Sequence, residues 1–427
     1  MKTNSIALLP KHRITHLVRN PSFAKRVLFN RLKLIKRGVL RVHDQGERYE
    51  FGINDNAKNS NNSSNLVVDV FIHDAQFYSD VIFGGSVGAG EAYMSGYWST
   101  PNLTNVMRLF AANLTALDSL DAQQSWISQG LLKLFHWFNR NTKEGARHNI
   151  AAHYDLGNDF FSLFLDESMM YSSAIYPSPE ASLSEAAQYK LQSVCKKLQL
   201  NKEDHLLEIG TGWGGMAIYA AQHYGCRVTT TTISKEQRDY AIAQVAAAGL
   251  CDRVTVLFDD YRELTGQFSK LVSIEMIEAV GHEHYDRYFE TCSGLLAANG
   301  LMLIQAISIP DQRYEQAHKS VDFIQRYIFP GGSLPSIAVL SDAISRKTDM
   351  NILHLEDIGD HYAQTLKHWR EAFMARLDEV RAQGFDERFI RMWEFYLSYC
   401  EGGFYERSIG TLQMLLAKPD YRREYFA

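Results

Sequence analysis

The chain has 427 residues, which is long enough for two or three domains with substantial hydrophobic cores. Its 46% hydrophobic and 22% charged content is that of an ordinary soluble protein, and no apolar run approaches the roughly 18–20 residues that span a bilayer. The apolar segment near the N-terminus is too short for a secretory signal, and the five cysteines match no metal-ligand spacing. These features argue against a membrane-spanning or disulfide-stapled protein and predict a cytoplasmic chain without a bound metal.

Positive charge is concentrated at the N-terminus. Residues 1–43 carry eleven Lys and Arg residues and no acidic residue. Taking these eleven charges from the total of −5 leaves −16 on the rest of the chain. Such a basic arm predicts an anionic partner, either a phospholipid surface or nucleic acid.

The first predicted element is a helix that Ser22 can cap and that ends before Gly38. Its apolar residues share one face and its basic residues lie mostly elsewhere: Ala24, Leu28, Leu32 and Ile35 against Lys25, Arg26, Arg31, Lys33, Lys36 and Arg37. A basic amphipathic helix can lie on anionic lipid headgroups. It can equally pack on its own domain and leave a solvated basic face, and the sequence does not decide between the two.

A small α+β domain is predicted for residues 1–140. A hairpin over 39–43 and 47–52 turns at Asp44-Gln-Gly46, and residues 66–73 alternate as a strand should. Residues 54–65 form an Asn/Ser-rich loop. Further along, residues 151–177 are dense in aromatic, Asp, Asn and Gly residues, which suits a lid over a site.

Regular βα alternation begins at residue 205 and predicts a parallel, doubly wound sheet. The last hundred residues add two amphipathic helices. Residues 351–355 and 410–416 are expected as edge strands, of which the second can be antiparallel. The main strands are expected at 205–210, 226–232, 253–258, 269–275 and 300–307.

The chain is organised around His205-Leu-Leu-Glu-Ile-Gly-Thr-Gly-Trp-Gly-Gly215, a buried strand that enters a glycine-rich turn before a helix. Gly210 and Gly212 allow close approach of a ligand, and the free N–H groups of the helix favour an anionic ligand group. Glu208 can hold the amino group of an amino-acid moiety. The second strand lacks the acid that a nicotinamide dinucleotide needs, so the pattern favours S-adenosylmethionine over NAD.

Six sequence blocks together resemble one family, the bacterial cyclopropane-fatty-acyl-phospholipid synthases and their mycolic-acid-modifying relatives. The blocks are His153-Tyr-Asp-Leu-Gly-Asn-Asp159, Tyr171-Ser172, Leu206–Gly215, Thr232-Ile-Ser-Lys-Glu-Gln237, Asp260-Tyr-Arg262 and Tyr327-Ile-Phe-Pro-Gly-Gly332. The resemblance implies an α/β, Rossmann-like class I methyltransferase domain over residues 141–427. It also implies that residues 1–140 are the lipid- or membrane-associated extra domain of the full-length bacterial enzymes.

The same resemblance implies which residues surround the cofactor, and Glu208 joins them by its position in the strand. Thr232 and Gln237 can bond the ribose hydroxyls, although Thr230–Thr232 can also be no more than a β-branched strand. Asp260 can accept a hydrogen bond from the adenine amino group. The full set is Tyr171, Ser172, Glu208, Gly210, Gly212, Thr232, Gln237, Asp260 and Tyr261.

Members of this family add a methylene group across an acyl-chain double bond, and a bound bicarbonate serves as the base. By resemblance its ligands fall on Ser173, Glu278, Gln305, Ile307 and Tyr362. Here Ser173 replaces a Cys, Gln305 replaces a His and Ala279 stands where a second His is common, which puts bicarbonate binding in question. Tyr362 equally suits an apolar core role.

Two further groups belong to this chemistry. Methyl transfer to an alkene leaves a carbocation, which the aromatic faces of Tyr171, Tyr327 and Phe329 could stabilise. Cys400 aligns with a cysteine sometimes assigned as the family's active-site residue. Its place on an apolar helix stripe favours a small hydrophobic role instead.

These patterns predict an enzyme that forms cyclopropane fatty acids in unsaturated phospholipids at the inner face of the membrane, with no nucleic acid partner. The resemblance to the family also implies that the enzyme forms a homodimer. A methyl-branched or methylene product is one alternative, because two base ligands are replaced. A small-molecule amine N-methyltransferase, which shares the Glu275-Met-Ile-Glu278 pattern, and a non-enzymatic lipid- or nucleic-acid-binding module are the others.

Overall fold

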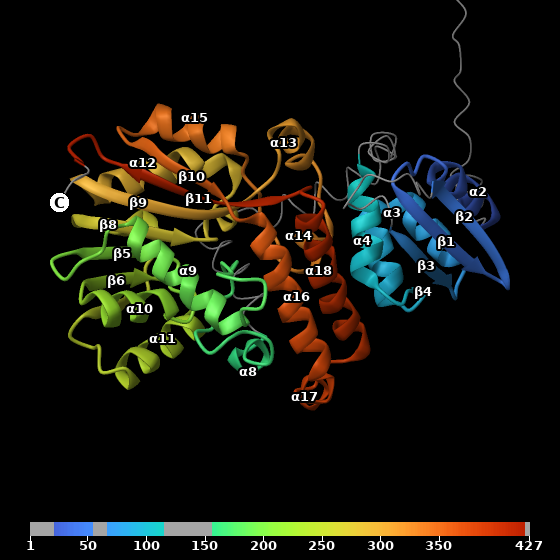
Figure 1. Ribbon diagram of the computed structural model, residues 1–427, viewed down its shortest axis with the longest axis horizontal. Helices are drawn as coiled ribbons and strands as arrows, with labels where there is room; N and C mark the ends of the chain where they lie inside the picture. The colour runs from blue at the N-terminus through green and yellow to red at the C-terminus, as the bar shows by residue number, and fades with distance from the viewer. Residues whose placement is uncertain (1–20, 54–65, 115–155, 423–427) are drawn as a thin grey trace, which may run out of the picture. The chain divides into compact units, whose positions relative to one another are not determined.

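The computed structural model describes residues 21–53, 66–114 and 156–422. The chain forms two compact units, Met1–Leu131 with Asp386–Phe395 and Leu132–Phe385 with Tyr396–Ala427 (Figure 1). Residues 1–20 of the basic arm, the loop at 54–65 and His153-Tyr-Asp155 of the predicted lid lie outside the described residues.

The smaller unit is built on a four-stranded sheet of order β2-β1-β3-β4. Strands β1 (Gly38–Asp44) and β2 (Glu47–Ile53) form the predicted antiparallel hairpin. At its turn Gln45 and Gly46 have φ angles of 51° and 84°, the left-handed pair that a two-residue type I′ turn requires. The remaining elements are β3 (Val67–Ile72), parallel to β1, β4 (Trp98–Ser99), α2 (Pro21–Leu32), α3 (Gln76–Met94), α4 (Leu103–Ala112) and the first part of α18 (Glu387–Tyr405).

Helix α2 packs its apolar stripe into its own unit. Ala24, Leu28 and Leu32 are all buried, so this stripe is not available to lie on headgroups. The interpretation of α2 as a helix whose apolar face rests on a membrane is therefore wrong, and the packed helix with a basic outer face is correct. Its solvent side and the residues just after it carry Arg26, Lys33, Lys36 and Arg37, all exposed.

The larger unit contains a seven-stranded sheet of order β10-β11-β9-β8-β5-β6-β7. The parallel strands are β5 (His205–Ile209), β6 (Arg227–Thr231), β7 (Val254–Leu257), β8 (Phe268–Ile274) and β9 (Leu296–Ser308). All five predicted strands form, and the predicted α/β doubly wound fold is confirmed. The prediction of residues 410–416 as an edge strand is wrong, because β11 (Gly410–Ala417) pairs antiparallel with both β9 and β10 (Asn351–Asp357).

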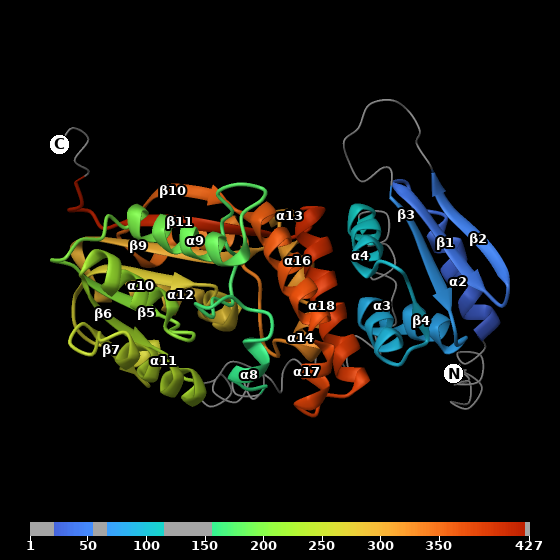
Figure 2. The ribbon, with the colours of Figure 1, turned by 60° about the horizontal axis from the view of Figure 1, so that its bottom comes forward.

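Helices cover both faces of this sheet (Figures 1 and 2). Leu206 and Val272 belong to the core beneath α9 (Leu183–Lys197), α10 (Gly215–Tyr224) and α11 (Lys235–Ala247). Their strand neighbours Leu207 and Leu271 belong to the opposite core, beneath α12 (Tyr285–Leu295) and α15 (Ile337–Lys347). This alternation is the period of two that a sheet buried on both faces shows.

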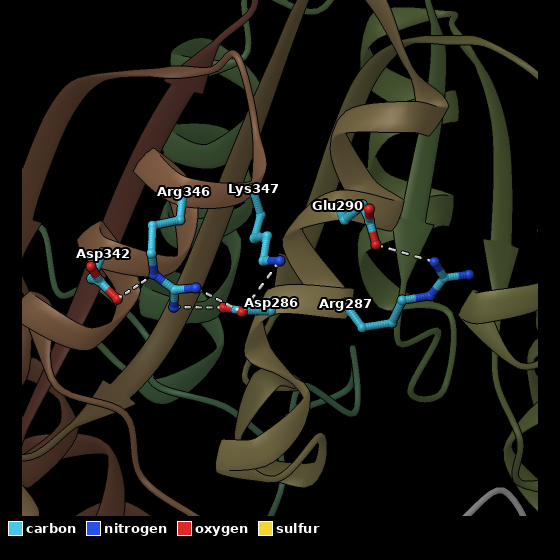
Figure 3. Close-up of polar contacts among 6 residues, drawn as sticks. All are labelled: Asp286, Arg287, Glu290, Asp342, Arg346 and Lys347. Carbon is cyan, nitrogen blue, oxygen red and sulfur yellow. Dashed lines mark hydrogen bonds and ion pairs between the residues drawn. The ribbon is translucent and has the colours of Figure 1, made fainter.

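The larger unit has further helices: α8 (Asn158–Phe161) before the first strand and, after it, η2 (Tyr261–Glu263), η3 (Ile277–Ala279), η4 (His282–His284), α13 (Asp311–Ala317), α14 (Phe323–Tyr327), α16 (Gly359–Ala375), α17 (Leu377–Ala382) and the rest of α18. On the surface Arg346 of α15 donates to both carboxylate oxygens of Asp286 of α12 at 2.8 Å and also to Asp342 (Figure 3). These hydrogen bonds from Arg346 lower the pKa of Asp286. Within the described residues, the structure has no helix that is both long and apolar enough to cross a membrane.

Candidate active site

The glycine-rich turn follows β5 and starts α10. Gly210 and Gly212 have φ angles of 102° and 52°, in the left-handed region that favours glycine. A side chain at Gly210 would press on Met276 at 3.3 Å, whereas one at Gly212 would meet no atom within 4 Å. Space beside Gly212 and the free N–H groups of α10 suit the carboxylate end of an amino-acid ligand.

Glu208 is buried at the end of β5 and accepts a hydrogen bond from Thr230 Oγ1 of β6 at 2.7 Å. Burial raises the pKa of Glu208 to about 8, and the bond from Thr230 and the charge of Lys190 oppose that rise. Lys190 of α9 is itself fully buried, which lowers its pKa to about 8 against the attraction of nearby carboxylates. An ammonium group brought to Glu208 would stabilise its ionised form.

Thr232 and Gln237 lie together after β6, as a ribose-binding pair must. Thr232 Oγ1 donates to Gln237 Oε1 at 3.0 Å, and both side chains are buried. Gln237 is held in the first turn of α11, where its N–H donates to the capping Ser234. The Gln237 amide thus keeps its two N–H donors for other acceptors.

Asp260 and Tyr261 follow β7. Arg262 donates to both carboxylate oxygens of Asp260, at 2.8 and 2.5 Å, an ion pair that the sequence analysis did not foresee. Tyr261 is half-buried with its ring 5.5 Å from that of Tyr288. The glycine turn, Glu208 and these two strand ends lie at the carboxyl edge of the parallel strands, so the residues present fit an adenosine ligand with an amino-acid tail.

Tyr171, Ser172 and Ser173 precede α9 and connect this edge to the end of β8. Ser172 Oγ accepts from Lys190 Nζ at 2.8 Å. The Tyr171 hydroxyl bonds that of Tyr396 at 2.9 Å, and its ring lies 5.2 Å from that of Trp369. Tyr171, Trp369 and their aromatic neighbours thus form an aromatic wall. It begins at the residue next to Ser172, which binds the Lys190 ammonium group.

Glu275 is the centre of the second half of the site. Its Oε1 accepts from the Ser173 N–H at 2.9 Å and from Gln305 Nε2 at 2.8 Å, and its Oε2 accepts from the Tyr362 hydroxyl at 2.7 Å. Burial raises the pKa of Glu275, and these three donors together with Lys190 oppose the rise. The backbone φ of Glu275 is 49°, a conformation costly for a non-glycine residue and typical of functional positions.

Glu278 and Ile307, also predicted around the base, lie at the same strand ends. Ile307 N–H donates to Glu278 Oε1 at 2.5 Å. Among the described residues, Oε2 of Glu278 is buried without a hydrogen-bond partner. Burial and then the charge of Glu275 raise the pKa of Glu278 to about 8, which favours the protonated form of Glu278 at neutral pH.

Tyr362 packs against two aromatic rings of the larger unit. Its ring stacks on Phe404 at 4.6 Å and meets Trp369 edge-on at 6.0 Å. Cys400 interacts electrostatically with Tyr362, and burial raises the pKa of its thiol well above the usual range, so it is no thiolate nucleophile. Phe329 lies 6.3 Å from Tyr171, while the Tyr327 ring lies against Phe323.

Lys190, Glu275 and Trp369 were not assigned roles from sequence. Lys190 carried a signal, because helical spacing places it on the same face as Ala186, Ala187 and Val194, where a cation needs partners. Glu275 was noted only as part of the strand end and of the Glu-Met-x-Glu pattern. Its central place depends on a left-handed backbone that no sequence pattern announces.

The chain is similar to known lipid-modifying enzymes. A model of the mycolic acid cyclopropane synthetase family matches residues 141–414. The tuberculostearic acid methyltransferase UfaA1 of Mycobacterium tuberculosis is 39% identical over 341 residues, covering 78% of this chain and 79% of that protein. The cyclopropane-fatty-acyl-phospholipid synthase of Escherichia coli (strain K12) is 36% identical over 353 residues, covering 82% and 88%.

A solved structure agrees. The mycolic acid cyclopropane synthase CmaA1, crystallised with S-adenosylhomocysteine (SAH) and CTAB, is 31% identical with a TM-score of 0.60, and the match covers 64% of this chain and 98% of that one. The family model spans more than half of the chain, and the cofactor edge described above has the matching chemistry. The chain therefore belongs to the mycolic acid cyclopropane synthetase family, and it is a methyltransferase that uses S-adenosylmethionine.

Proposed function

We propose that this enzyme methylates cis double bonds in the acyl chains of membrane phospholipids and closes the product to a cyclopropane, with Glu275 as the proton acceptor. One observation carries the proposal: a partly buried carboxylate held by three hydrogen-bond donors beside the rings of Tyr171, Trp369 and Tyr362. The names of the relatives, a phospholipid cyclopropane synthase among them, support a lipid substrate.

The chemistry requires a base and a way to tolerate positive charge. When bound, S-adenosylmethionine supplies an electrophilic methyl group. Addition of a methyl to one alkene carbon leaves a cation on the other, and the C–H electron pair of the new methyl then forms the third side of the ring as its proton leaves. Glu275 accepts that proton, because its three donors and Lys190 stabilise its ionised form against the effect of burial.

The aromatic residues are suited to the cation. The Tyr171 ring lies 6.3 Å from that of Phe329 and 5.2 Å from that of Trp369. The Trp369 ring lies 6.0 Å from that of Tyr362, whose hydroxyl bonds Glu275. Aromatic faces attract cations by about 0.5–2 kcal/mol each, more where water is excluded. The wall therefore favours the charged intermediate without offering a nucleophile that would capture it.

Bicarbonate, expected from resemblance, does not fit this arrangement. The Ser173 N–H is bonded to the carboxylate of Glu275 rather than open to an anion, and so are the Gln305 amide and the Tyr362 hydroxyl. These are three of the five positions that resemblance assigned to bicarbonate ligands. A carboxylate of the chain itself takes those hydrogen bonds, so the proposed reaction has no step that uses bicarbonate.

The test is an analysis of lipids from bacterial cells that lack cyclopropane lipids of their own. Cells expressing the enzyme should gain phospholipid acyl chains heavier by one methylene group, with cyclopropane methylene protons at unusually high field in NMR. Cells expressing Glu275→Gln should not. Absence of both signals in cells with active, folded enzyme would refute the proposal.

A second product is supported by the similarity to the tuberculostearic acid methyltransferase, which is the higher of the two identities given above. If the cation moves by a hydride shift before Glu275 acts, loss of a methyl proton gives a methylene group rather than a ring. Vinylidene proton signals in place of high-field signals would establish that outcome. Methylation of a soluble amine with no lipid product would instead support the N-methyltransferase alternative.

The smaller unit has a surface suited to anionic phospholipid. Phe23, Arg26 and Asn30 recur at helical spacing on the exposed side of α2, and Lys33 and an exposed Leu34 follow at its end. Phe23 is 44% exposed and Leu34 is 43% exposed. Basic and apolar side chains together are the composition of a membrane-contacting surface, at about 1 kcal/mol per well-placed cation.

Vesicle sedimentation tests this assignment of residues 1–140. Lys33→Glu should weaken binding to phosphatidylglycerol vesicles roughly tenfold. Arg48→Glu, on the exposed side of β2, is the control with an equal charge change. Equal losses in both variants would show that only net charge matters.

The expected homodimer is tested separately, by light scattering of the purified protein without vesicles.

A further inference from the structure

A row of polar side chains crosses one face of the large sheet and ends at Glu275. Gln305 of β9 lies directly opposite Gln413 of β11, and Gln413 lies opposite Glu356 of β10. Both glutamines are fully buried. Lys197, the last residue of α9, reaches the same row from the helix that covers this face. Buried amides lower stability unless they are hydrogen-bonded, so the partners of the two glutamines matter for the fold.

The hydrogen bonds in the row all run in one direction. Lys197 Nζ donates to Glu356 and, at 2.6 Å, to Gln413 Oε1. Gln413 Nε2 donates to Gln305 Oε1 at 2.8 Å. Gln305 Nε2 then donates to Glu275 Oε1 at 2.8 Å and to the Ser173 carbonyl at 3.3 Å.

This direction is set by the residue at the edge. An ammonium group has donors and no acceptor, so Lys197 binds the carbonyl end of the Gln413 amide and leaves its N–H groups for Gln305. The same constraint then applies to Gln305, whose carbonyl is occupied and whose N–H groups face Glu275. Turning either amide over would bring two carbonyl oxygens together or set a carbonyl against a carboxylate.

We infer that Lys197 and Gln413 are positioning residues, which hold the Gln305 amide with its N–H groups turned to the carboxylate of Glu275. The inference rests on the proposed role of Glu275 as proton acceptor. A hydrogen-bond relay runs from Lys197 through Gln413 to Gln305 and reaches Glu275 through the Gln305 amide. Lys197 and Gln413 therefore act on Glu275 through Gln305.

The relay contributes to keeping Glu275 ionised. A donor to a carboxylate stabilises its charged form, so weakening that donor raises the pKa of Glu275. The other titratable groups that interact with Glu275 are Lys190 from α9, Glu278 from η3, Tyr362 from α16 and Tyr396 from α18. Substitutions at the far end of the relay leave these in place, which makes the relay's own effect measurable.

The test uses the full chain with Lys197→Met, Gln413→Met, the double variant, and Lys196→Met as a matched control on the exposed side of α9. Glutamate labelled with 13C at Cδ reports the titration midpoint of Glu275, assigned by its loss in Glu275→Gln. Each single variant should raise the midpoint by about one pH unit. The double variant should raise it no further, and Lys196→Met should not move it.

Turnover gives a second readout. With vesicles of dioleoylphosphatidylglycerol, the acid limb of the pH–rate profile should move upward by the same amount, so that turnover below the midpoint falls up to about tenfold. A shift in Lys197→Met alone would overturn the relay in favour of a simple charge effect, since Gln413→Met removes no charge. No shift in either would overturn it outright.

Two controls keep the result interpretable. If Gln413→Met does not fold, Lys197→Arg must restore the midpoint that Lys197→Met changes, because Arg keeps the donors; failure to restore it refutes the relay. Full activity in Glu275→Gln would refute the proposed function instead. The titration of Glu275 needs no turnover, so the relay is still tested in that case.

Discussion

Two carboxylates of the larger unit, the buried Glu208 and the partly buried Glu275, interact with the same ammonium group of Lys190 but are held differently. Glu208 has a hydrogen bond from Thr230 on the adjacent strand, and burial dominates, so its pKa rises to about 8. Glu275 has donors from three separate parts of the chain. Burial raises the pKa of Glu275 as well, but three donors oppose that rise where Glu208 has one, so hydrogen bonding favours the ionised form more strongly at Glu275.

The largest effect is expected from Glu275→Gln. The amide cannot accept a proton, so kcat should fall by about 1,000-fold, within the range typical of lost general bases. The Kd for S-adenosylmethionine should stay nearly unchanged. Stopped-time assays of SAH release and calorimetry separate the two quantities, with Glu290→Gln on the surface of α12 as control. A variant that binds the cofactor poorly but turns over normally would contradict the division of roles.

Glu208→Gln should show the opposite pattern. A carboxylate that bonds an ammonium group contributes about 1.5–3 kcal/mol, so cofactor affinity should fall on the order of 10–100-fold. At saturating cofactor, kcat should change far less than in Glu275→Gln. Calorimetric titration with S-adenosylmethionine measures the loss, and an unaltered Kd would remove Glu208 from the cofactor site.

Glu278→Gln should change how stability depends on pH. The pKa of Glu278 is raised from 4.5 to about 8, so the folded state binds this proton more tightly than the unfolded state, and stability falls as pH rises between these values. The variant lacks that proton. Its free energy of unfolding relative to the parent should therefore increase from pH 5 to pH 8, on the order of 1–3 kcal/mol. Urea unfolding at both values checks this, and a difference independent of pH would contradict it.

The smallest effect is expected at the surface pair of α12 and α15. Arg346→Ala removes exposed hydrogen bonds to Asp286 and Asp342, and exposed ion pairs contribute little. The melting temperature should fall slightly at low salt and match the parent at high salt, because salt screens the pair. Scanning calorimetry at two salt concentrations measures this, and turnover should not change.

Much of the fold was predictable because it rests on local patterns. The βα alternation and the glycine turn placed all five parallel strands, and the Gln45-Gly46 turn placed the hairpin. The position of β11 was not predictable in the same way. Whether residues 410–417 lie at an edge or between two strands depends on pairing with β9, about a hundred positions earlier, and with β10, about sixty positions earlier, and local sequence does not report such pairing.

The candidate site likewise contains residues that local patterns predicted and residues that long-range contacts placed. Gly210, Glu208 and Thr232 stand at the ends of recognisable strands, where parallel sheets bind ligands. Resemblance placed Glu278 in the site, whereas Glu275, which follows the same strand, was given no role. The backbone at Glu275 turns its side chain toward Ser173 and Tyr362, which come from segments about a hundred residues before and ninety residues after it.

The left-handed backbone at Glu275 has a consequence for how such an enzyme obtains its base. Glycine is the residue that this conformation prefers, so Glu275→Gly should fold without strain and leave three donors facing an empty, carboxylate-sized space. Added formate or bicarbonate should then restore turnover in a saturable way, whereas Glu275→Gln should not respond. A single codon would in that case separate a methyltransferase with a resident base from one that depends on an anion from the medium.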